Sequence, residues 1–298
     1  MKNWNYLLAE LAKRNLVPKK IVTSEWHSWH IVSSFDLESS NFISESVSMG
    51  ISQNPDIAIR KSITEFCERS FIKSSNDPIA HLTERSDGFA AYPNLDVHAQ
   101  SRAAENALNE AAERYLWSMW WDFPEFKFKM SNYENDSFNS QLHFLISEFN
   151  LDKVEVVEII DKDSKFLLKI LVATNQQGGT LTGGACEKLP LTDSANINLN
   201  ERAFGELLRH LLAYEKIKKT KSINLSFYEQ RLFGFASGQW KNRVSDRFKN
   251  TGKNQIKLPS LIANSQIKHE HSDLIYLHRC LFVDQPTFIG GRVDRLCI

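Results

Sequence analysis

The chain has 298 residues, of which 42% are hydrophobic and 24% are charged, so it is long enough for one large globular domain or two small ones. Its formal net charge is zero at pH 7, which gives no global argument for nucleic acid or an anionic membrane surface as a partner. The N-terminus does not read as a signal peptide, no apolar run approaches the roughly 20 residues of a membrane span, and the four cysteines are scattered, so we expect a cytoplasmic protein with reduced thiols.

In the first quarter of the chain, a helical pattern precedes two strand-like patterns and a second helix. Residues 3–14 have the apolar spacing of an amphipathic helix, and residues 30–36 and 42–52 read as strands. The second helix is predicted over residues 55–74, because Asn54 is a suitable N-cap and a proline follows at the first helical position.

The middle of the chain continues in the same alternating way. Residues 79–96 read as a loop, and a long helix is predicted over residues 97–119, before a proline that stops it. Two strands follow, over residues 153–160 and 165–174, joined by a polar turn.

A third long helix is predicted near residues 198–217, after the glycine-rich stretch GGTLTGGA. Asn198 and Glu201 have the spacing of a capping box at its start. Near the C-terminus, DLIYLHRCLFVDQP reads as a strand that Pro286 stops. With no clear linker, we expect a single domain over residues 1–298, built from about three repeated strand–loop–helix units.

The pattern E-x-x-E-R occurs twice, each time inside a predicted helix. Its residues are Glu65, Glu68 and Arg69 in one copy, and Glu110, Glu113 and Arg114 in the other. The spacing places all three side chains on one helix face. One copy is well explained as a solvated face, but a chain of this length should hold only roughly 0.06 copies by chance. Two copies therefore favour shared chemistry in repeated units.

The third long helix adds Arg202 and Glu206, again opposite its apolar stripe. If the three charged faces converge, they form a pocket of carboxylates lined with guanidinium groups. Mg²⁺ binds carboxylates together with phosphate oxygens, and arginine binds phosphate with two parallel donors. The pattern therefore predicts a Mg²⁺–nucleotide site made from helices, without a glycine-rich phosphate loop.

Three blocks resemble the YcaO family, in the family's order and over most of the chain. They are SMGISQNPDIAIRKSITEFCERS, SDGFAAYPNLDVHAQSRAAENALNEAAERYLWSMWW and VATNQQGGTLTGGACEKLPLTDSANINLNERAFGELLRHL. The first two resemble the family's small-residue loops followed by E-x-x-E-R helices. The third is similar to its strand, glycine-rich turn and R-x-x-x-E helix.

This resemblance implies an α+β fold of repeated strand–loop–helix units, with mainly antiparallel sheet and helices whose charged faces converge on a nucleotide site. It also implies an enzyme that uses ATP and Mg²⁺ to modify backbone amides of a ribosomally made precursor peptide. The product is an azoline with a Cys, Ser or Thr nucleophile, a thioamide with sulfide, or an amidine with an amine. The implied partners are the precursor peptide and a helper protein that delivers its leader, and a homodimer is left open.

By matching position, the resemblance also implies roles for single residues. The candidate Mg²⁺ ligands are Glu65, Glu68, Glu110, Glu113 and Glu206. The candidate nucleotide contacts are Arg69, Arg114, Arg202 and Ser86, of which Arg114 and Arg202 are also the candidate catalytic residues.

The second block departs from the family pattern at several positions. Asp87 replaces an Asn, Tyr92 replaces a Gly, and the stretch before Glu110 is longer. Arg102 stands where the family has a further acidic residue, and Asp96 is a candidate to substitute for it. The C-terminus also lacks the proline-rich tail of many azoline-forming members, which weakens the ring-forming interpretation.

Two other hypotheses therefore stay open beside the enzyme. One is a degenerate relative that binds nucleotide or peptide and serves as a scaffold for another subunit. The other is a plain α+β domain whose acidic helix faces are solvated. ATP hydrolysis in the presence of a candidate peptide distinguishes the enzyme from both.

Overall fold

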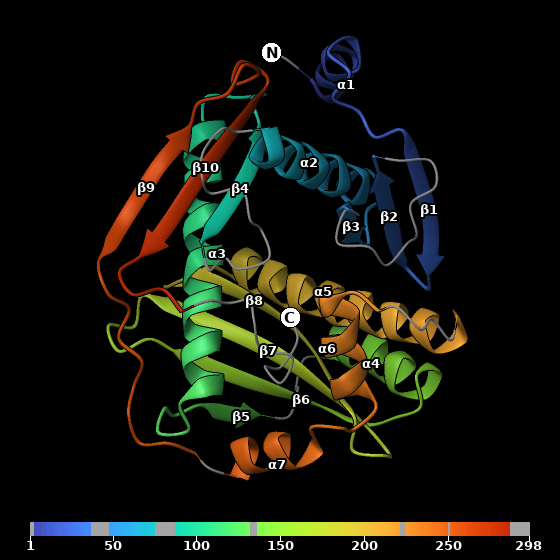
Figure 1. The fold of residues 1–298 in the computed structure, drawn as a ribbon, viewed down its shortest axis with the longest axis vertical. Coiled ribbons are helices and arrows are strands. Elements are labelled where there is room, and N and C mark those ends of the chain that lie inside the picture. The colour runs from blue at the N-terminus through green and yellow to red at the C-terminus, as the bar shows by residue number, and fades with distance from the viewer. Residues whose placement is uncertain are drawn as a thin grey trace. The chain divides into compact units, whose positions relative to one another are not determined.

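The computed structural model describes residues 3–36, 48–74, 87–131, 136–220, 225–249 and 251–286 (Figure 1). Within these ranges the helices are α1 (Trp4–Lys13), α2 (Pro55–Ser74), α3 (Ala99–Asp122), α4 (Asp136–Glu148), α5 (Asp193–Thr220), α6 (Phe227–Ala236) and α7 (Lys241–Lys249). The strands are β1 (Lys20–Trp26), β2 (Trp29–Phe35), β3 (Ser48–Ser52), β4 (Gly88–Pro93), β5 (Lys129–Ser131), β6 (Leu151–Ile160), β7 (Phe166–Asn175), β8 (Thr180–Lys188), β9 (Leu261–Ile267) and β10 (Ile275–Phe282). Their ladders are antiparallel, which confirms the predicted α+β class with mainly antiparallel sheet.

The chain divides into two compact units. Unit 1 comprises Met1–Arg114 with Pro259–Gly290, and unit 2 comprises Tyr115–Leu258 with Gly291–Ile298, so the boundary falls within α3. The expectation of a single domain over residues 1–298 stays a prediction. Every helix in the described ranges is too short or too polar to span a bilayer.

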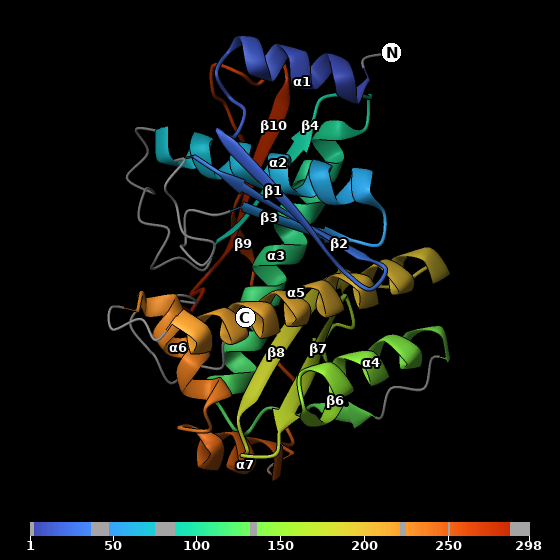
Figure 2. The same cartoon turned by 90° about the vertical axis from the view of Figure 1, so that its right-hand side faces the viewer.

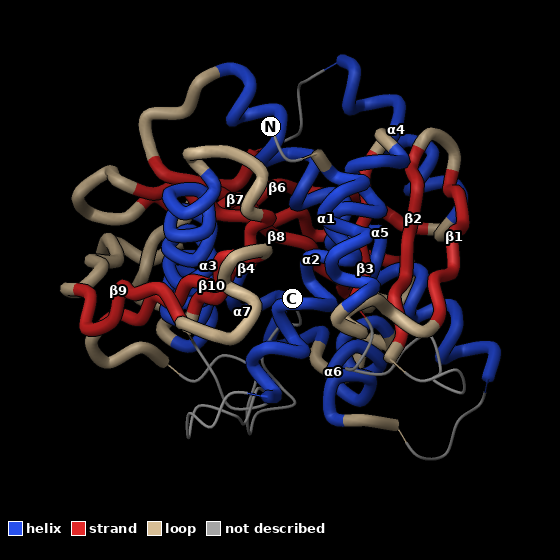
Figure 3. The backbone as a smooth tube through the Cα atoms, turned by 90° about the horizontal axis from the view of Figure 1, so that it is seen from above, coloured by secondary structure: helices blue, strands red, loops and turns tan. Residues whose placement is uncertain are grey.

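Unit 1 contains two three-stranded sheets, with the strand orders β1-β2-β3 and β4-β10-β9. Figure 3 shows β1 and β2 side by side, as their antiparallel register requires. Helix α2 packs across β2 and β3 (Figure 2). Gly50 of β3 makes this close approach possible, because a Cβ atom there would lie 1.9 Å from the carbonyl oxygen of Ala58 in α2.

The start of α2 matches its prediction. The Asn54 side-chain oxygen accepts the N–H groups of Asp56 at 2.9 Å and Ile57 at 3.2 Å, as an N-cap does. The other face of α2 packs into a core shared with α1, β4 and β10, whose buried members include Leu11, Phe66, Phe89 and Leu277.

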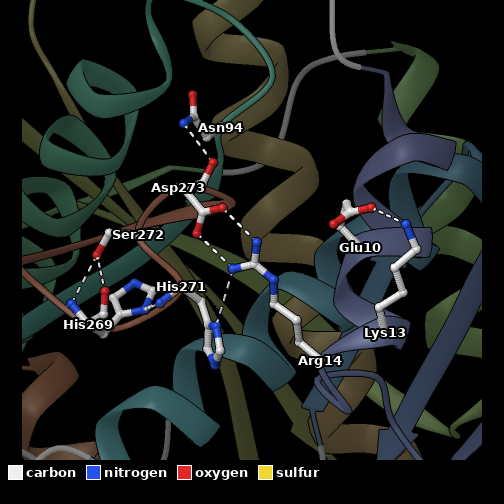
Figure 4. Close-up of polar contacts among 8 residues, drawn as sticks. All are labelled: Glu10, Lys13, Arg14, Asn94, His269, His271, Ser272 and Asp273. Atoms are coloured by element: carbon white, nitrogen blue, oxygen red, sulfur yellow. Dashed lines mark hydrogen bonds and ion pairs between the residues drawn. The ribbon is translucent and has the colours of Figure 1, made fainter.

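Helix α1 is tied to the segment before β10 by a polar cluster (Figure 4). The Arg14 guanidinium donates to both carboxylate oxygens of Asp273, at 2.8 and 2.7 Å, and lies 3.4 Å from Nδ1 of His271. Asn94, just after β4, donates to the Asp273 carbonyl at 3.0 Å. These contacts hold β4, β10 and α1 together in unit 1.

Unit 2 is built on a four-stranded sheet in the order β5-β6-β7-β8. Helix α5 packs against β8 at Gly183, where a Cβ atom would lie 2.0 Å from the Leu207 nitrogen. The next residue, Gly184, faces the ring of Trp117 on the other side of the sheet. The predicted apolar stripe of α5 is buried as expected, at Leu199, Ala203, Leu207, Leu208 and Leu211.

Three local predictions were wrong. Helix α5 begins at Asp193 rather than near residue 198, so Asn198 lies inside the helix and caps nothing; instead Thr192 Oγ1 accepts the Ala195 N–H at 3.2 Å. Most of the glycine-rich stretch, from Thr180 on, belongs to the strand β8, and only Gly178 and Gly179 lie in the turn before it. Part of the expected loop over residues 79–96 is the strand β4, and residues 75–86 lie outside the described part.

Candidate functional site

Three glutamates of unit 1 accept hydrogen bonds at the edges of its two sheets. β3 and β4 are edge strands, so some of their N–H groups have no strand partner. The pairs are Met49 N–H to Glu65 Oε2 (2.8 Å), Phe89 N–H to Glu110 Oε2 (2.7 Å) and Ala91 N–H to Glu68 Oε2 (3.0 Å). Carboxylates from α2 and α3 thus cap backbone donors that would otherwise need another strand.

The two E-x-x-E-R copies use their first glutamate and their arginine in the same way. Arg69 donates to Glu65 Oε1, and Arg114 donates to Glu110 Oε1, each across one helical turn. Each first glutamate therefore has one oxygen on a strand N–H and the other on a guanidinium. This repeated geometry supports the interpretation that the two copies have a common role.

Glu68, the second glutamate of the pattern in α2, interacts with the negative charges of both Glu65 and Glu110. Its pKa is raised to about 8, mainly by burial and then by the negative charges of Glu110 and Glu65, against the lowering effect of the Ala91 hydrogen bond. The charges of α2 and α3 therefore do converge within unit 1. Carboxylates so crowded need a proton or a cation to share the site.

Glu65, Glu68 and Glu110 of unit 1 are carboxylates, which are among the oxygen ligands that Mg²⁺ takes in proteins. Mg²⁺ in nucleotide sites usually takes one or two carboxylates, with phosphate and water oxygens completing its shell. Among the residues that the structure describes, no three His, Cys, Asp or Glu side chains are arranged to hold a metal ion by themselves. A nearby cation would favour the charged form of Glu68, which burial disfavours.

The α5 candidates Arg202 and Glu206 lie in unit 2, where each pairs with a charged side chain. Arg202 donates to Glu187 Oε2 at 3.2 Å and to the Cys186 carbonyl at 3.3 Å. Glu206 pairs with Arg209 at 3.5 Å. That these α5 residues meet the charged faces of α2 and α3 stays a prediction.

The roles of two further candidates, Glu113 and Ser86, stay predictions. Glu113 is partly exposed on α3, one turn after Glu110. Ser86 lies outside the described residues.

Arg102 contacts both Tyr92 and Asp96. Arg102 donates to the Tyr92 hydroxyl at 2.8 Å and to Asp96 Oδ2 at 3.2 Å, and its guanidinium lies 5.5 Å from the centre of the Tyr92 ring. Asp96 therefore neutralises Arg102 in this structure. Its suggested use as a substitute metal ligand requires this exposed ion pair to open.

Sequence reasoning missed the side-chain partner of Asp87. Asp87 is buried, and its Oδ2 accepts Nε and Nη2 of Arg279 in β10, both at 2.6 Å. The Asp87 carbonyl also accepts a hydrogen bond from Arg114. No local pattern predicts a pair whose members lie 192 residues apart in sequence.

Comparisons with known proteins give structural matches only, because no protein-family model and no curated protein sequence matches the chain. The E. coli microcin synthetase McbBCD complex contains a chain with a TM-score of 0.59 and 10% identity, covering 89% of this chain and 88% of that one. A second structure of that complex, with pro-MccB17 bound, gives a TM-score of 0.56 and 11% identity over 89% and 88% of the two chains.

The YcaO protein from Methanopyrus kandleri, solved with AMPPCP and Mg²⁺, has a TM-score of 0.59 and 10% identity. That match covers 99% of this chain and 92% of the other. At such low identity the likeness concerns the fold alone, and it agrees with the order of strand–helix units described above. The chain therefore has the fold of the YcaO proteins.

Proposed function

We propose that this protein is an ATP-dependent enzyme that modifies backbone amides of a ribosomally made precursor peptide. The observation that carries the proposal is the convergence of Glu65, Glu68 and Glu110 on two strand edges, with an arginine beside two of them. A plain solvated helix face would leave these carboxylates in water, whereas Glu68 is shielded enough for its pKa to rise to about 8.

The proposed reaction starts with addition of a nucleophile to an amide carbonyl of the peptide. The amide oxygen is a poor leaving group, and transfer of the γ-phosphate of ATP to it makes it a good one. Its departure as phosphate then leaves the carbon bonded to the nucleophile. Phosphoryl transfer of this kind needs mainly positioning and charge neutralisation from the protein.

In the proposal, the residues of this chain supply both the positioning and the charge neutralisation. Glu65, Glu68, Glu110, Glu113 and Glu206 are the proposed Mg²⁺ ligands, of which Glu68 is the best supported. Mg²⁺, when bound, would neutralise charge on the phosphates. Arg69, Arg114 and Arg202 are the proposed phosphate contacts, because guanidinium groups bind phosphate with parallel donors.

The proposed partners are a precursor peptide, a helper protein that delivers its leader segment, and, as an open alternative, a second copy of the chain. The McbBCD neighbour is itself a complex, and one of its structures holds pro-MccB17. This is a property of that protein, and it supports a search for a peptide and a partner subunit here.

The test is to incubate the protein with ATP, Mg²⁺ and each short open reading frame product encoded beside its gene. Phosphate release is measured together with the peptide mass. Loss of water would indicate an azoline or an amidine formed within the peptide, and exchange of oxygen for sulfur, in a parallel incubation with sulfide, would identify a thioamide. Binding of nucleotide or peptide without release in any combination would instead support the scaffold hypothesis, which the Arg102–Asp96 pair keeps open.

A further inference from the structure

Asp87 is a buried carboxylate with one dedicated cation. Only 7% of the residue is exposed, and its Oδ2 accepts a hydrogen bond from Nε of Arg279 and forms an ion pair with Nη2 of the same guanidinium, both at 2.6 Å. A buried carboxylate without a cation is costly, so each partner depends on the other. The antiparallel register of β10 with β4 brings Arg279 opposite Phe89, two residues after Asp87.

The backbone carbonyl of Asp87 connects the Asp87–Arg279 pair to Arg114. Its carbonyl oxygen accepts Nη1 of Arg114, while Nη2 of the same guanidinium donates to Glu110 Oε1. A guanidinium is planar, with its donors in a fixed fork, so two anchors on different elements set both its place and its plane. Arg114 is thus held by α3 on one side and by the start of β4 on the other.

The start of β4 has little freedom to move relative to α3. A Cβ atom on Gly88 would lie 1.9 Å from the Ala107 carbonyl oxygen and 2.4 Å from the Ala111 nitrogen, so strand and helix are in direct backbone contact. What remains adjustable is the orientation of the Asp87 peptide, and the Asp87–Arg279 pair fixes it from the other side.

We propose that Arg279 is a positioning residue for Arg114, acting through Asp87. The Arg279 guanidinium holds the Asp87 carboxylate toward β10, so that Asp87 offers Arg114 only its carbonyl oxygen. Without Arg279, the buried carboxylate would compete for Arg114, which already donates to the Asp87 carbonyl, and that contact would turn the Arg114 fork away from a bound phosphate. This inference rests on the proposed role of Arg114 as a phosphate contact.

The relation between the three residues yields a rescue test. Arg279→Gln should weaken binding of AMPPCP with Mg²⁺, measured by calorimetry, by about tenfold, which is about 1.4 kcal/mol. Adding Asp87→Asn should bring the affinity back to within about threefold of the wild type, because the competing charge is gone. A merely structural pair would show this rescue in stability alone, whereas a positioning residue shows it in the affinity of the folded protein. Thermal unfolding of each variant separates loss of folded protein from loss of affinity.

If Arg279→Gln alone does not fold, Arg279→Lys tests the same point, because it keeps the charge beside Asp87 and removes the fork. We expect a loss of about threefold that Asp87→Asn recovers. Suppose that Arg114→Ala weakens nucleotide binding. Unchanged affinity in the folded Arg279 variant, or a loss of affinity that Asp87→Asn does not reverse, would then overturn the inference. If Arg114→Ala binds the nucleotide as the wild type does, the phosphate role of Arg114 is wrong, and the inference is wrong with it.

Discussion

In the absence of divalent cations, replacing Glu68 by Gln should raise the stability of the protein at high pH and change its stability little at low pH. In the folded state, burial raises the pKa of Glu68 to about 8, and the charge of Glu110 contributes to the rise. In the unfolded chain, the same carboxyl ionises near its ordinary value of 4.5. Between these values the unfolded state releases a proton that the folded state keeps. Stability therefore falls as pH rises from about 4.5 to about 8, and the loss stops above that.

The size of the effect follows from the shift in pKa. At about 1.4 kcal/mol for each unit, a rise from 4.5 to about 8 gives an upper limit of about 5 kcal/mol. Glu68 is only partly buried by its surface exposure, so solvent and local relaxation reduce this value. We expect the difference between Glu68→Gln and the wild type to grow by about 2–3 kcal/mol between about pH 5 and about pH 9.

Urea unfolding of both proteins in EDTA across this pH range measures the difference directly. Glu105→Gln is the matched control, since it removes an exposed carboxylate of α3. Its stability should follow the wild type at every pH. A constant difference between Glu68→Gln and the wild type, or a wild type that gains stability relative to the variant as pH rises, would refute the raised pKa and the crowding of the three carboxylates.

Three other predictions concern the fold, the nucleotide site and the departures in the second block. Gly88→Ala should destabilise the protein by about 3 kcal/mol or more, because its Cβ would overlap the Ala107 carbonyl; a melting temperature equal to the wild type would contradict this. Arg202→Ala should lower stability by about 1 kcal/mol or less, since the Glu187 pair is partly exposed, yet lower phosphate release by the equivalent of about 2–4 kcal/mol. A large loss of stability with full activity per folded molecule would make Arg202 a structural residue. If the wild type releases phosphate, Arg102→Glu should release it as well. Release by the variant alone, with none from the wild type, would identify the natural chain as a disabled relative.

Helices with a clear apolar stripe and a good cap could be predicted from sequence. The start of α2 follows from Asn54 and the proline after it. In the structure Asn54 caps the helix and the proline is its first residue. The start of α5 was missed because residues 193–198 are mostly exposed there, so the first turns carry no apolar signal. β8 was missed because Gly183 and Gly184 indicate a turn locally, whereas they are needed for close contact with α5 and Trp117.

The candidate site was predictable to a similar extent. The E-x-x-E-R spacing correctly indicated that glutamates and arginines share helix faces, since that depends only on helix geometry. The capping of strand edges by Glu65, Glu68 and Glu110 could not be predicted, because it depends on which strands lie at the edges. Arg279 carries no local signal at all, and only the pairing of β4 with β10 brings it to Asp87.

The most direct test of the proposed site is the dependence of nucleotide affinity on Mg²⁺. Calorimetric titration of the wild type with ATP, once in Mg²⁺ and once in EDTA, compares the two states on the same protein. Because crowded carboxylates repel a triphosphate unless a divalent cation lies between them, we expect binding in Mg²⁺ that is lost in EDTA. Equal affinity in both titrations would contradict it.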